Sequence, residues 1–237
     1  MGTHSSGLGR GRDKPGRPGD EKTVLERLAR VSALIAATGR NPDEVEIVAV
    51  TKGFDVSVCM LAVQAGLRNL GENRVQEALK KMDDVAGAEW HLIGHLQTNK
   101  VKQATGRFAL IQSVDSGRLA EAIATHDPNQ AVLVEVNVAR EPQKSGVAPD
   151  QALELIAAVS TTLDLQGLMA MGPTEGDPTP AFNELRTLRD EAEQRTGKRL
   201  PVLSMGMSGD FEAALAAGST MLRLGQALFG PRAKVIT

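Results

Sequence analysis

The sequence predicts an α/β protein, a single (β/α)8 TIM-type barrel with an extra N-terminal helix. Two observations predict it. Eight short apolar runs alternate with segments of helical periodicity, and strands that alternate with helices pair in parallel, so that eight such units close into a barrel. The length, 237 residues, lies within the roughly 200 to 250 that such barrels use as one domain. An open doubly wound sheet is the alternative on this pattern.

The chain divides into a tail and one domain. Residues 1–22 are rich in Gly, Pro, Arg and Ser and show no apolar periodicity, which predicts a disordered tail. From Thr23 onward Val24, Leu28, Val31 and Ile35 recur at helical spacing, before a stop signal at Gly39. We therefore expect a helix here, and residues 23–237 to form the barrel domain.

The remaining elements follow in order. Each expected strand is a short run of mainly Val, Ile, Leu, Ala or Met, and the runs lie at residues 45–50, 67–70, 90–93, 109–114, 131–138, 165–170, 202–205 and 220–224. Each expected helix carries apolar residues three or four apart, at residues 56–64, 75–82, 118–124, 151–159, 182–195 and 211–217.

Composition narrows the function classes. The net charge of −2 gives no global field that would attract nucleic acid or an anionic membrane, and no apolar run reaches the length of a membrane span. We therefore expect the protein to bind neither nucleic acid nor a membrane. A single cysteine, Cys59, fits a reducing compartment, so we expect a cytoplasmic protein, and a monomer. Cys59 itself lies in an apolar helix and is expected in the core. The chain has no Tyr, so no phenol of its own can serve as an acid or base.

Polar residues sit late in several strands. In the fifth strand Glu135 and Asn137 share the parity opposite to the β-branched residues, so both should point into the barrel, where a carboxylate needs a partner. Lys52 and Arg223 end the first and eighth strands, near the mouth where barrel enzymes keep their chemistry. The alternative is a buried ion-pair network that only fills the barrel.

A phosphate-binding turn is expected after the seventh strand. Ser208 precedes a helix within a Gly-rich turn, and Gly225 and Gln226 after the eighth strand would form the other wall. The alternative is that Ser208 is an ordinary helix N-cap. Asp210 in the same turn would compete electrostatically with a phosphate.

Two histidines four residues apart, His91 and His95, invite a zinc interpretation. We reject it, because the segment reads as a strand entering a loop and no third ligand is apparent. His91 is expected to be a packed strand residue.

A lysine at the mouth with a phosphate site nearby has two chemical uses. It can form a Schiff base with pyridoxal 5'-phosphate or with a phosphorylated carbonyl substrate, as in aldolases. For the cofactor, Arg223 is the candidate partner of the ring nitrogen. An Arg leaves that nitrogen largely unprotonated, which predicts weak carbanion chemistry.

Seven ordered motifs together resemble the pyridoxal-phosphate homeostasis protein family (YggS/PROSC). They are AVTK at 49–52, GENRVQE at 71–77, WHLIGHLQTNK at 90–100, KSG at 144–146, GLMAM at 167–171, SMGMS at 204–208 and RLG at 223–225.

The resemblance implies an alanine-racemase-type barrel in which Lys52 carries pyridoxal 5'-phosphate as a Schiff base. It places Ser208 and the Gly225–Gln226 region at the phosphate, Arg223 at the ring nitrogen, and Asn73 and Met207 beside the cofactor. Two residues depart from the family pattern, since Gln226 replaces a common Thr and Arg74 a common aromatic residue.

The function implied is to carry and buffer the cofactor and to maintain vitamin B6 and amino-acid pools, without turnover, with PLP-dependent apo-enzymes as possible recipients. The alternative is a low-activity PLP-dependent amino-acid racemase. Alanine racemase takes its second base from a Tyr of the partner subunit's second domain, and here we expect neither a Tyr nor a second domain after the eighth strand.

Overall fold

A computed structural model describes residues 20–231. Its parallel strands form a closed barrel in sequence order, and β1 pairs with β8 through Glu46–Met221 to Ala49–Leu224. This closure confirms the barrel and excludes the open sheet. The strands are β1 (Glu46–Val50), β2 (Asn69–Glu72), β3 (Glu89–Leu92), β4 (Leu110–Val114), β5 (Ala131–Glu135), β6 (Asp164–Met169), β7 (Val202–Ser204) and β8 (Met221–Leu224).

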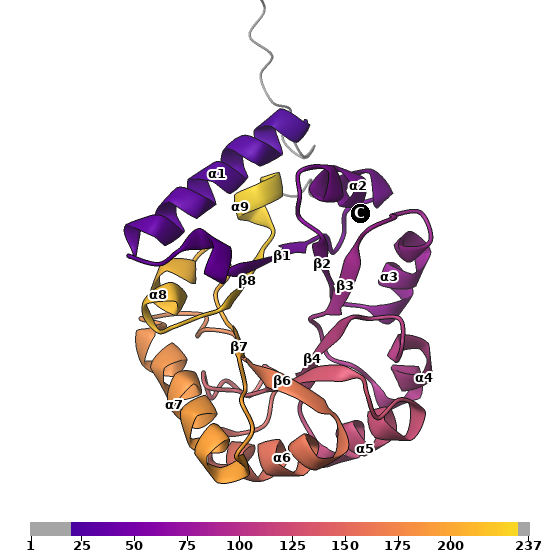
Figure 1. Cartoon of the computed structure of the whole chain (residues 1–237), viewed down its shortest axis with the longest axis vertical. Helices are drawn as coiled ribbons and strands as arrows, with labels where there is room; N and C mark the ends of the chain where they lie inside the picture. The colour runs from indigo at the N-terminus through magenta and orange to yellow at the C-terminus, as the bar shows by residue number, and fades with distance from the viewer. Residues whose placement is uncertain (1–19, 232–237) are drawn as a thin grey trace, which may run out of the picture.

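Helices surround the strands on the outside (Figure 1). They are α1 (Glu21–Ala37), α2 (Val56–Gln64), α3 (Val75–Met82), α4 (Val101–Ala104), α5 (Gly117–His126), α6 (Pro149–Thr162), α7 (Thr179–Thr196), α8 (Phe211–Ala216) and α9 (Gln226–Phe229), with short 3-10 turns η1 (Pro42–Glu44) and η2 (Thr98–Lys100). The predicted bounds of α2 and α3 are confirmed. No helix within residues 20–231 is long and apolar enough to cross a membrane.

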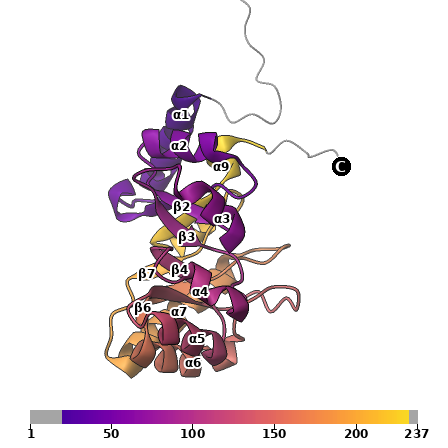
Figure 2. The same ribbon diagram turned by 90° about the vertical axis from the view of Figure 1, so that its right-hand side faces the viewer.

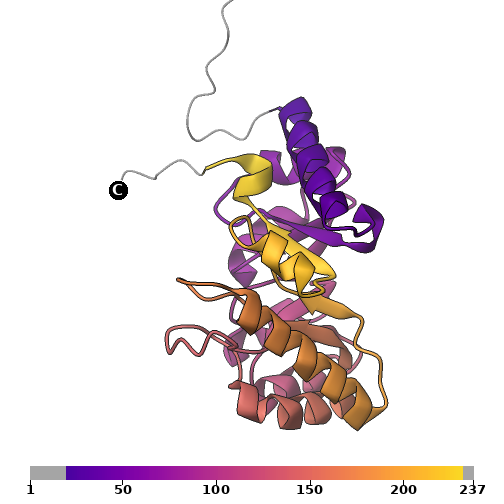
Figure 3. The ribbon, with the colours of Figure 1, turned by 90° about the vertical axis from the view of Figure 1, so that its left-hand side faces the viewer.

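The N-terminal helix α1 lies across the outside of the barrel, beside α9 (Figures 1 and 3). Asp20 caps α1 by accepting a hydrogen bond from the Thr23 amide, so Glu21 and Lys22 are helical rather than part of a tail. The rest of the predicted tail, 1–19, lies outside the described residues. An Arg27 guanidinium donates to the Leu228 carbonyl at 3.1 Å and ties α1 to α9.

Two apolar layers follow from strand alternation. Residues of one parity pack outward against the helices in a large core, which includes Cys59 at 0% exposure, as predicted. Residues of the other parity fill the barrel with a small plug of five buried side chains, Val48, Leu110, Leu133, Met169 and Met221. The plug fills part of the barrel interior, and the cavity described below lies at the carboxyl ends of the strands.

Two predicted strands differ from the structure by more than one residue at a boundary. β2 lies at Asn69–Glu72 rather than 67–70, because its pairing with β1 and β3 sets the register rather than the local apolar run. β5 ends at Glu135 rather than at 138. Beyond it Val136 forms only an isolated bridge to Val147, and Asn137 Nδ2 donates to the carbonyls of loop residues Glu141 and Lys144.

The loops that follow β5 and β6 project from the same end of the barrel as α9 (Figure 2). Lys144 Nζ donates to the Gly172 carbonyl at 2.6 Å, and the Thr174 amide donates to Glu141 Oε1 at 2.7 Å. These bonds join the two loops into one wall beside the mouth.

Candidate functional site

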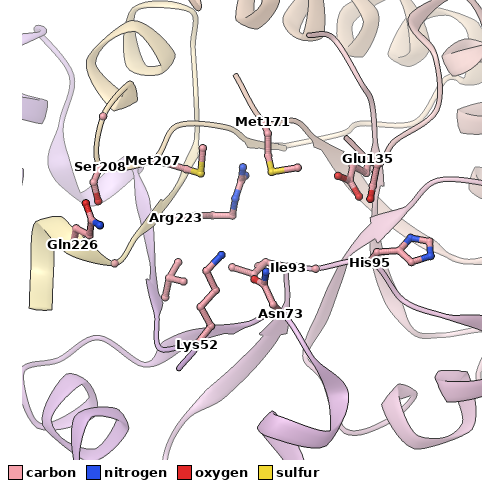
Figure 4. Close-up of a pocket in the computed structure, with 15 residues that line it drawn as sticks. Lys52, Asn73, Ile93, His95, Glu135, Met171, Met207, Ser208, Arg223 and Gln226 are labelled. Atoms are coloured by element: carbon pink, nitrogen blue, oxygen red, sulfur yellow. The ribbon is translucent and has the colours of Figure 1, made fainter. Parts of the chain in front are cut away.

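One cavity of about 410 Å³ opens at the carboxyl ends of the strands. All seven residues that the sequence nominates as cofactor contacts line it, namely Lys52, Asn73, Met207, Ser208, Arg223, Gly225 and Gln226. Sequence reasoning did not assign Val50, Ile93, Ser145 or Met171 to it, although they line it too. Figure 4 shows Lys52 and Arg223 reaching into the cavity, with Ser208 and Gln226 on one side and Glu135 on the other.

A buried polar cluster fixes the backbone next to Lys52. Thr51 Oγ1 donates to Glu72 Oε1 at 2.7 Å, and Lys81 Nζ donates to the same oxygen at 2.8 Å and to the Thr51 carbonyl at 3.2 Å. On the other side of Lys52, the Gly53 amide donates to Glu77 Oε1. The half-buried Lys52 side chain therefore starts from a segment held by β2 and α3. The strand predicted at 67–70 left Glu72 outside the sheet, whereas it lies within β2 and belongs to this cluster.

Arg223 is buried, at 4% exposure, and is held by carbonyls rather than by a carboxylate. Its NH1 donates to the Ser204 carbonyl and to Ser204 Oγ, both at 2.7 Å, and NH2 donates to the Ala170 carbonyl at 2.8 Å. Burial lowers the pKa of Arg223 to about 10, so the guanidinium stays charged at neutral pH. These bonds replace the ion pair with Glu135 that the ion-pair alternative requires.

A chain of buried side chains extends from Arg223 across the barrel. Ser204 Oγ donates to Gln112 Oε1 at 2.7 Å, and Gln112 Nε2 lies 3.0 Å from His91 Nδ1. Because Arg223 can only donate hydrogen bonds, the Ser204 hydroxyl accepts from Arg223 and donates to Gln112 Oε1. The Gln112 Nε2 group then donates to His91 Nδ1. His91 Nδ1 is thus an acceptor and the ring is neutral, in agreement with burial, which lowers the pKa of His91 to about 4.

Sequence reasoning missed this chain. It expected His91 only as a packed strand residue, which its 4% exposure confirms, and gave no role to Gln112 or Ser204. The signal was one polar residue at an inward position in each of β3, β4 and β7, and only the closed barrel shows that these positions meet. His95 lies apart at the rim, where its Nδ1 is 3.1 Å from Asp115 Oδ2. Within residues 20–231, no group of three His, Cys, Asp or Glu side chains could hold a metal ion.

Ser208 does not cap the helix that follows it in sequence. α8 begins at Phe211 with Asp210 as its N-cap, and Ser208 Oγ instead accepts a hydrogen bond from the Ala227 amide in the first turn of α9, at 3.1 Å. Asp210 Oδ1 accepts from the Met207 amide at 2.6 Å, so one of its oxygens serves its own turn. The structure therefore joins the turn after β7 to the start of α9, the two segments that the sequence nominated as opposite walls.

Two glycines permit close approaches around the cavity. A Cβ on Gly94 would lie 2.5 Å from the Asn73 carbonyl oxygen, so the loop that carries Asn73 packs directly on the end of β3. Gly206 has φ +100°, and a Cβ there would lie 2.7 Å from Ala214 Cβ. Only Gly fits this turn without strain, and the turn delivers Met207 and Ser208 to the cavity.

Glu135 lies in the barrel as its parity predicts, at 2% exposure. Its Oε2 has no hydrogen-bond partner among the described residues. Burial, reinforced by the negative charge of Asp115 and opposed by Arg223, raises the pKa of Glu135 to about 7. The predicted inward direction is confirmed, but the expected cationic partner is not in contact with this oxygen.

The family model "Alanine racemase, N-terminal domain" matches residues 25–233. An alanine racemase from Corynebacterium glutamicum superposes with a TM-score of 0.72 at 15% identity, over 92% of this chain and 63% of that one. At this identity the likeness shows the fold alone.

Relatives of higher identity match along most of their length. The pyridoxal phosphate homeostasis protein of Aquifex aeolicus is 41% identical over 88% of this chain and 98% of its own, and that of Escherichia coli K12 is 38% identical over 86% and 92%. PipY of Synechococcus elongatus, solved with PLP bound, has a TM-score of 0.76 at 34% identity, covering 87% of this chain and 100% of that one. The chain belongs to the alanine racemase N-terminal domain family and, within it, to the pyridoxal phosphate homeostasis proteins.

Proposed function

We propose that this protein binds pyridoxal 5'-phosphate, carries and buffers it, and maintains vitamin B6 and amino-acid pools in the cytoplasm without turnover of its own. The observation that carries the proposal is that one cavity collects Lys52 from the turn after β1, Arg223 from β8 and Ser208 from the turn after β7. The relatives named above, and the PLP-bound PipY, support the same cofactor.

The residues present fit the cofactor. Lys52 would hold it covalently through its aldehyde carbon, Arg223 would face the ring nitrogen, and Ser208 with the backbone of Gly225 and Gln226 would bind the phosphate. Asn73 and Met207 would lie along its sides. The volume of about 410 Å³ lies within the range of small-molecule sites. When bound, the cofactor supplies an electrophilic carbon that exchanges amines and an electron sink for carbanions.

Arg223 supports carriage rather than catalysis. Its guanidinium is charged, and three hydrogen bonds to Ser204 and Ala170 fix it in place. A permanently charged donor does not give a proton to the ring nitrogen, so the ring remains a weak electron sink. We infer that the protein is a monomer and that its activity is to take up and release the cofactor. PLP-dependent apo-enzymes are the recipients.

Absorbance and trapping test the proposal directly. The protein incubated with pyridoxal 5'-phosphate should show a visible band, and borohydride reduction should fix the cofactor on the Lys52 peptide. Lys52→Ala should lose both signals, whereas Lys102→Ala, which removes an exposed lysine of α4, should keep them. A colourless wild-type protein, or label on another lysine, contradicts the proposal.

Turnover separates carriage from the racemase alternative. Amino-acid racemisation at ordinary enzyme rates, about 1 to 10³ per second, abolished by Lys52→Ala, would replace carriage with catalysis. Transfer of bound cofactor to an apo-enzyme, timed against spontaneous dissociation into buffer, then distinguishes delivery by contact from simple release.

A further inference from the structure

The carboxylate of Glu135 lies across the cavity from the expected phosphate end. It ends β5, lines the cavity, and is separated in the view of Figure 4 from Ser208 and Gln226 by Arg223 and Met171. At 2% exposure it is almost withdrawn from bulk water. None of the contacts proposed above for the cofactor uses it.

The described residues leave this carboxylate incompletely satisfied. Its Oε2 accepts no hydrogen bond. Arg223 is engaged by Ser204 and Ala170, and the nearby carboxylate of Asp115 adds like charge and engages His95. A buried carboxylate oxygen without a donor is unfavourable, so a ligand that brings a donor gains the free energy that the protein leaves unused.

The chemistry of the missing donor is restricted. A metal ion would need several ligating side chains, and no group of three His, Cys, Asp or Glu in residues 20–231 could hold one. A guanidinium prefers to engage both carboxylate oxygens side by side, whereas one oxygen, Oε2, is left without a partner here. A primary ammonium, which can direct one N–H to one oxygen, fits best.

We propose that Glu135 forms an ammonium subsite, which binds the primary amino group of a ligand in the same cavity as the cofactor. The inference rests on the proposed function, because the cofactor site supplies the rest of the cavity. The ammonium has two sources. It belongs either to a phosphorylated amine that occupies the phosphate end as well, or to a small amine that enters the loaded protein.

The experiment compares wild type, Glu135→Gln and Asp115→Asn. Glu135→Gln keeps the shape and removes the charge of the subsite, whereas Asp115→Asn removes a nearby negative charge that does not line the cavity. The first arm titrates pyridoxamine 5'-phosphate into the cofactor-free proteins by calorimetry. The second titrates ethylamine into the proteins loaded with pyridoxal 5'-phosphate and follows the visible band.

A subsite predicts that Glu135→Gln weakens binding in one arm by roughly tenfold or more, as expected for loss of a hydrogen bond to a charged group, while Asp115→Asn stays within about threefold of wild type. The arm that responds identifies the source of the ammonium. Equal affinities for Glu135→Gln and wild type in both arms, or equal losses in the two variants, overturn the inference.

Uptake of pyridoxal 5'-phosphate is measured first on the same proteins. Failure in wild type refutes the proposed function, whereas normal uptake with no effect of Glu135→Gln in either arm refutes the subsite alone. Circular dichroism establishes folding of each variant. Glu135→Asp, which keeps the charge on a shorter side chain, should bind the amine more tightly than Glu135→Gln does.

Discussion

Glu135→Gln is expected to stabilise the cofactor-free protein at alkaline pH and to have little effect in acid. Burial raises the pKa of Glu135 from 4.5 to about 7. The folded protein therefore keeps a proton that the unfolded chain has already released, and the contribution to stability, complete below pH 4.5, is lost as pH rises through 7. A shift of about 2.5 pH units at 1.36 kcal/mol each amounts to about 3 kcal/mol.

Urea unfolding followed by fluorescence measures this difference, because Trp90 is the single tryptophan of the chain and is buried in β3. The free energy of unfolding of Glu135→Gln minus that of wild type should increase by about 3 kcal/mol between about pH 4.5 and pH 8. His91 titrates in both proteins, so its contribution cancels. A difference that is independent of pH, or a variant less stable than wild type at pH 8, would show that the carboxylate is ionised and satisfied, and would refute the reasoning.

Three further predictions follow. Lys81→Met should lower the free energy of unfolding by about 3 kcal/mol, because it leaves Glu72 buried without its countercharge, and adding Glu72→Gln should restore most of the loss in urea titrations. Gly94→Ala should displace the Asn73 loop and weaken cofactor retention, measured by dialysis, at a stability cost of about 1 to 3 kcal/mol; unchanged retention would contradict a role for that packing. Burial lowers the pKa of His91 from 6.5 to about 4, so stability, complete above pH 6.5, should fall by up to about 3 kcal/mol as pH drops through 4, and His91→Gln should remove this slope.

The sequence was sufficient for the fold because barrel strands obey a local rule. An apolar run lies in or overlaps each of the eight strands, and closure follows from their number and alternation. The pairing register of the strands was harder to predict from the sequence. The β2 segment contains Gly71 and Glu72, which have low strand propensity, and pairing on both sides draws them into the sheet. The neighbouring strands determine where β2 begins and ends, and the sequence of the segment alone does not.

The residues of the site were predictable from the sequence, but their hydrogen-bond partners were not. Lys52, Arg223 and Ser208 could be nominated because their positions at strand ends imply the mouth of the barrel. The partner of Ser208 could not, since the Ala227 amide comes from another segment, 19 residues further along the chain. Nor could the link from Gln112 to Ser204, which spans 92 residues. Sequence indicated that Glu135 faces inward, but the pairing of the inward polar groups depends on distances across the closed barrel.

The polar groups inside this barrel are not equally satisfied. The side chains from His91 to Arg223 hydrogen-bond to one another, whereas Glu135 Oε2, in the cavity wall, has no hydrogen-bond partner among residues 20–231. The free energy of folding that the cofactor-free protein loses by burying the Glu135 carboxylate is the same quantity that a bound ammonium can recover. A ligand that returns the pKa of Glu135 to 4.5 gains at most about 3 kcal/mol above pH 7, or roughly 300-fold in affinity. The stability difference between Glu135→Gln and wild type therefore sets the scale of the binding difference, and a subsite that strengthened binding far beyond it would have to draw on contacts other than relief of this buried carboxylate.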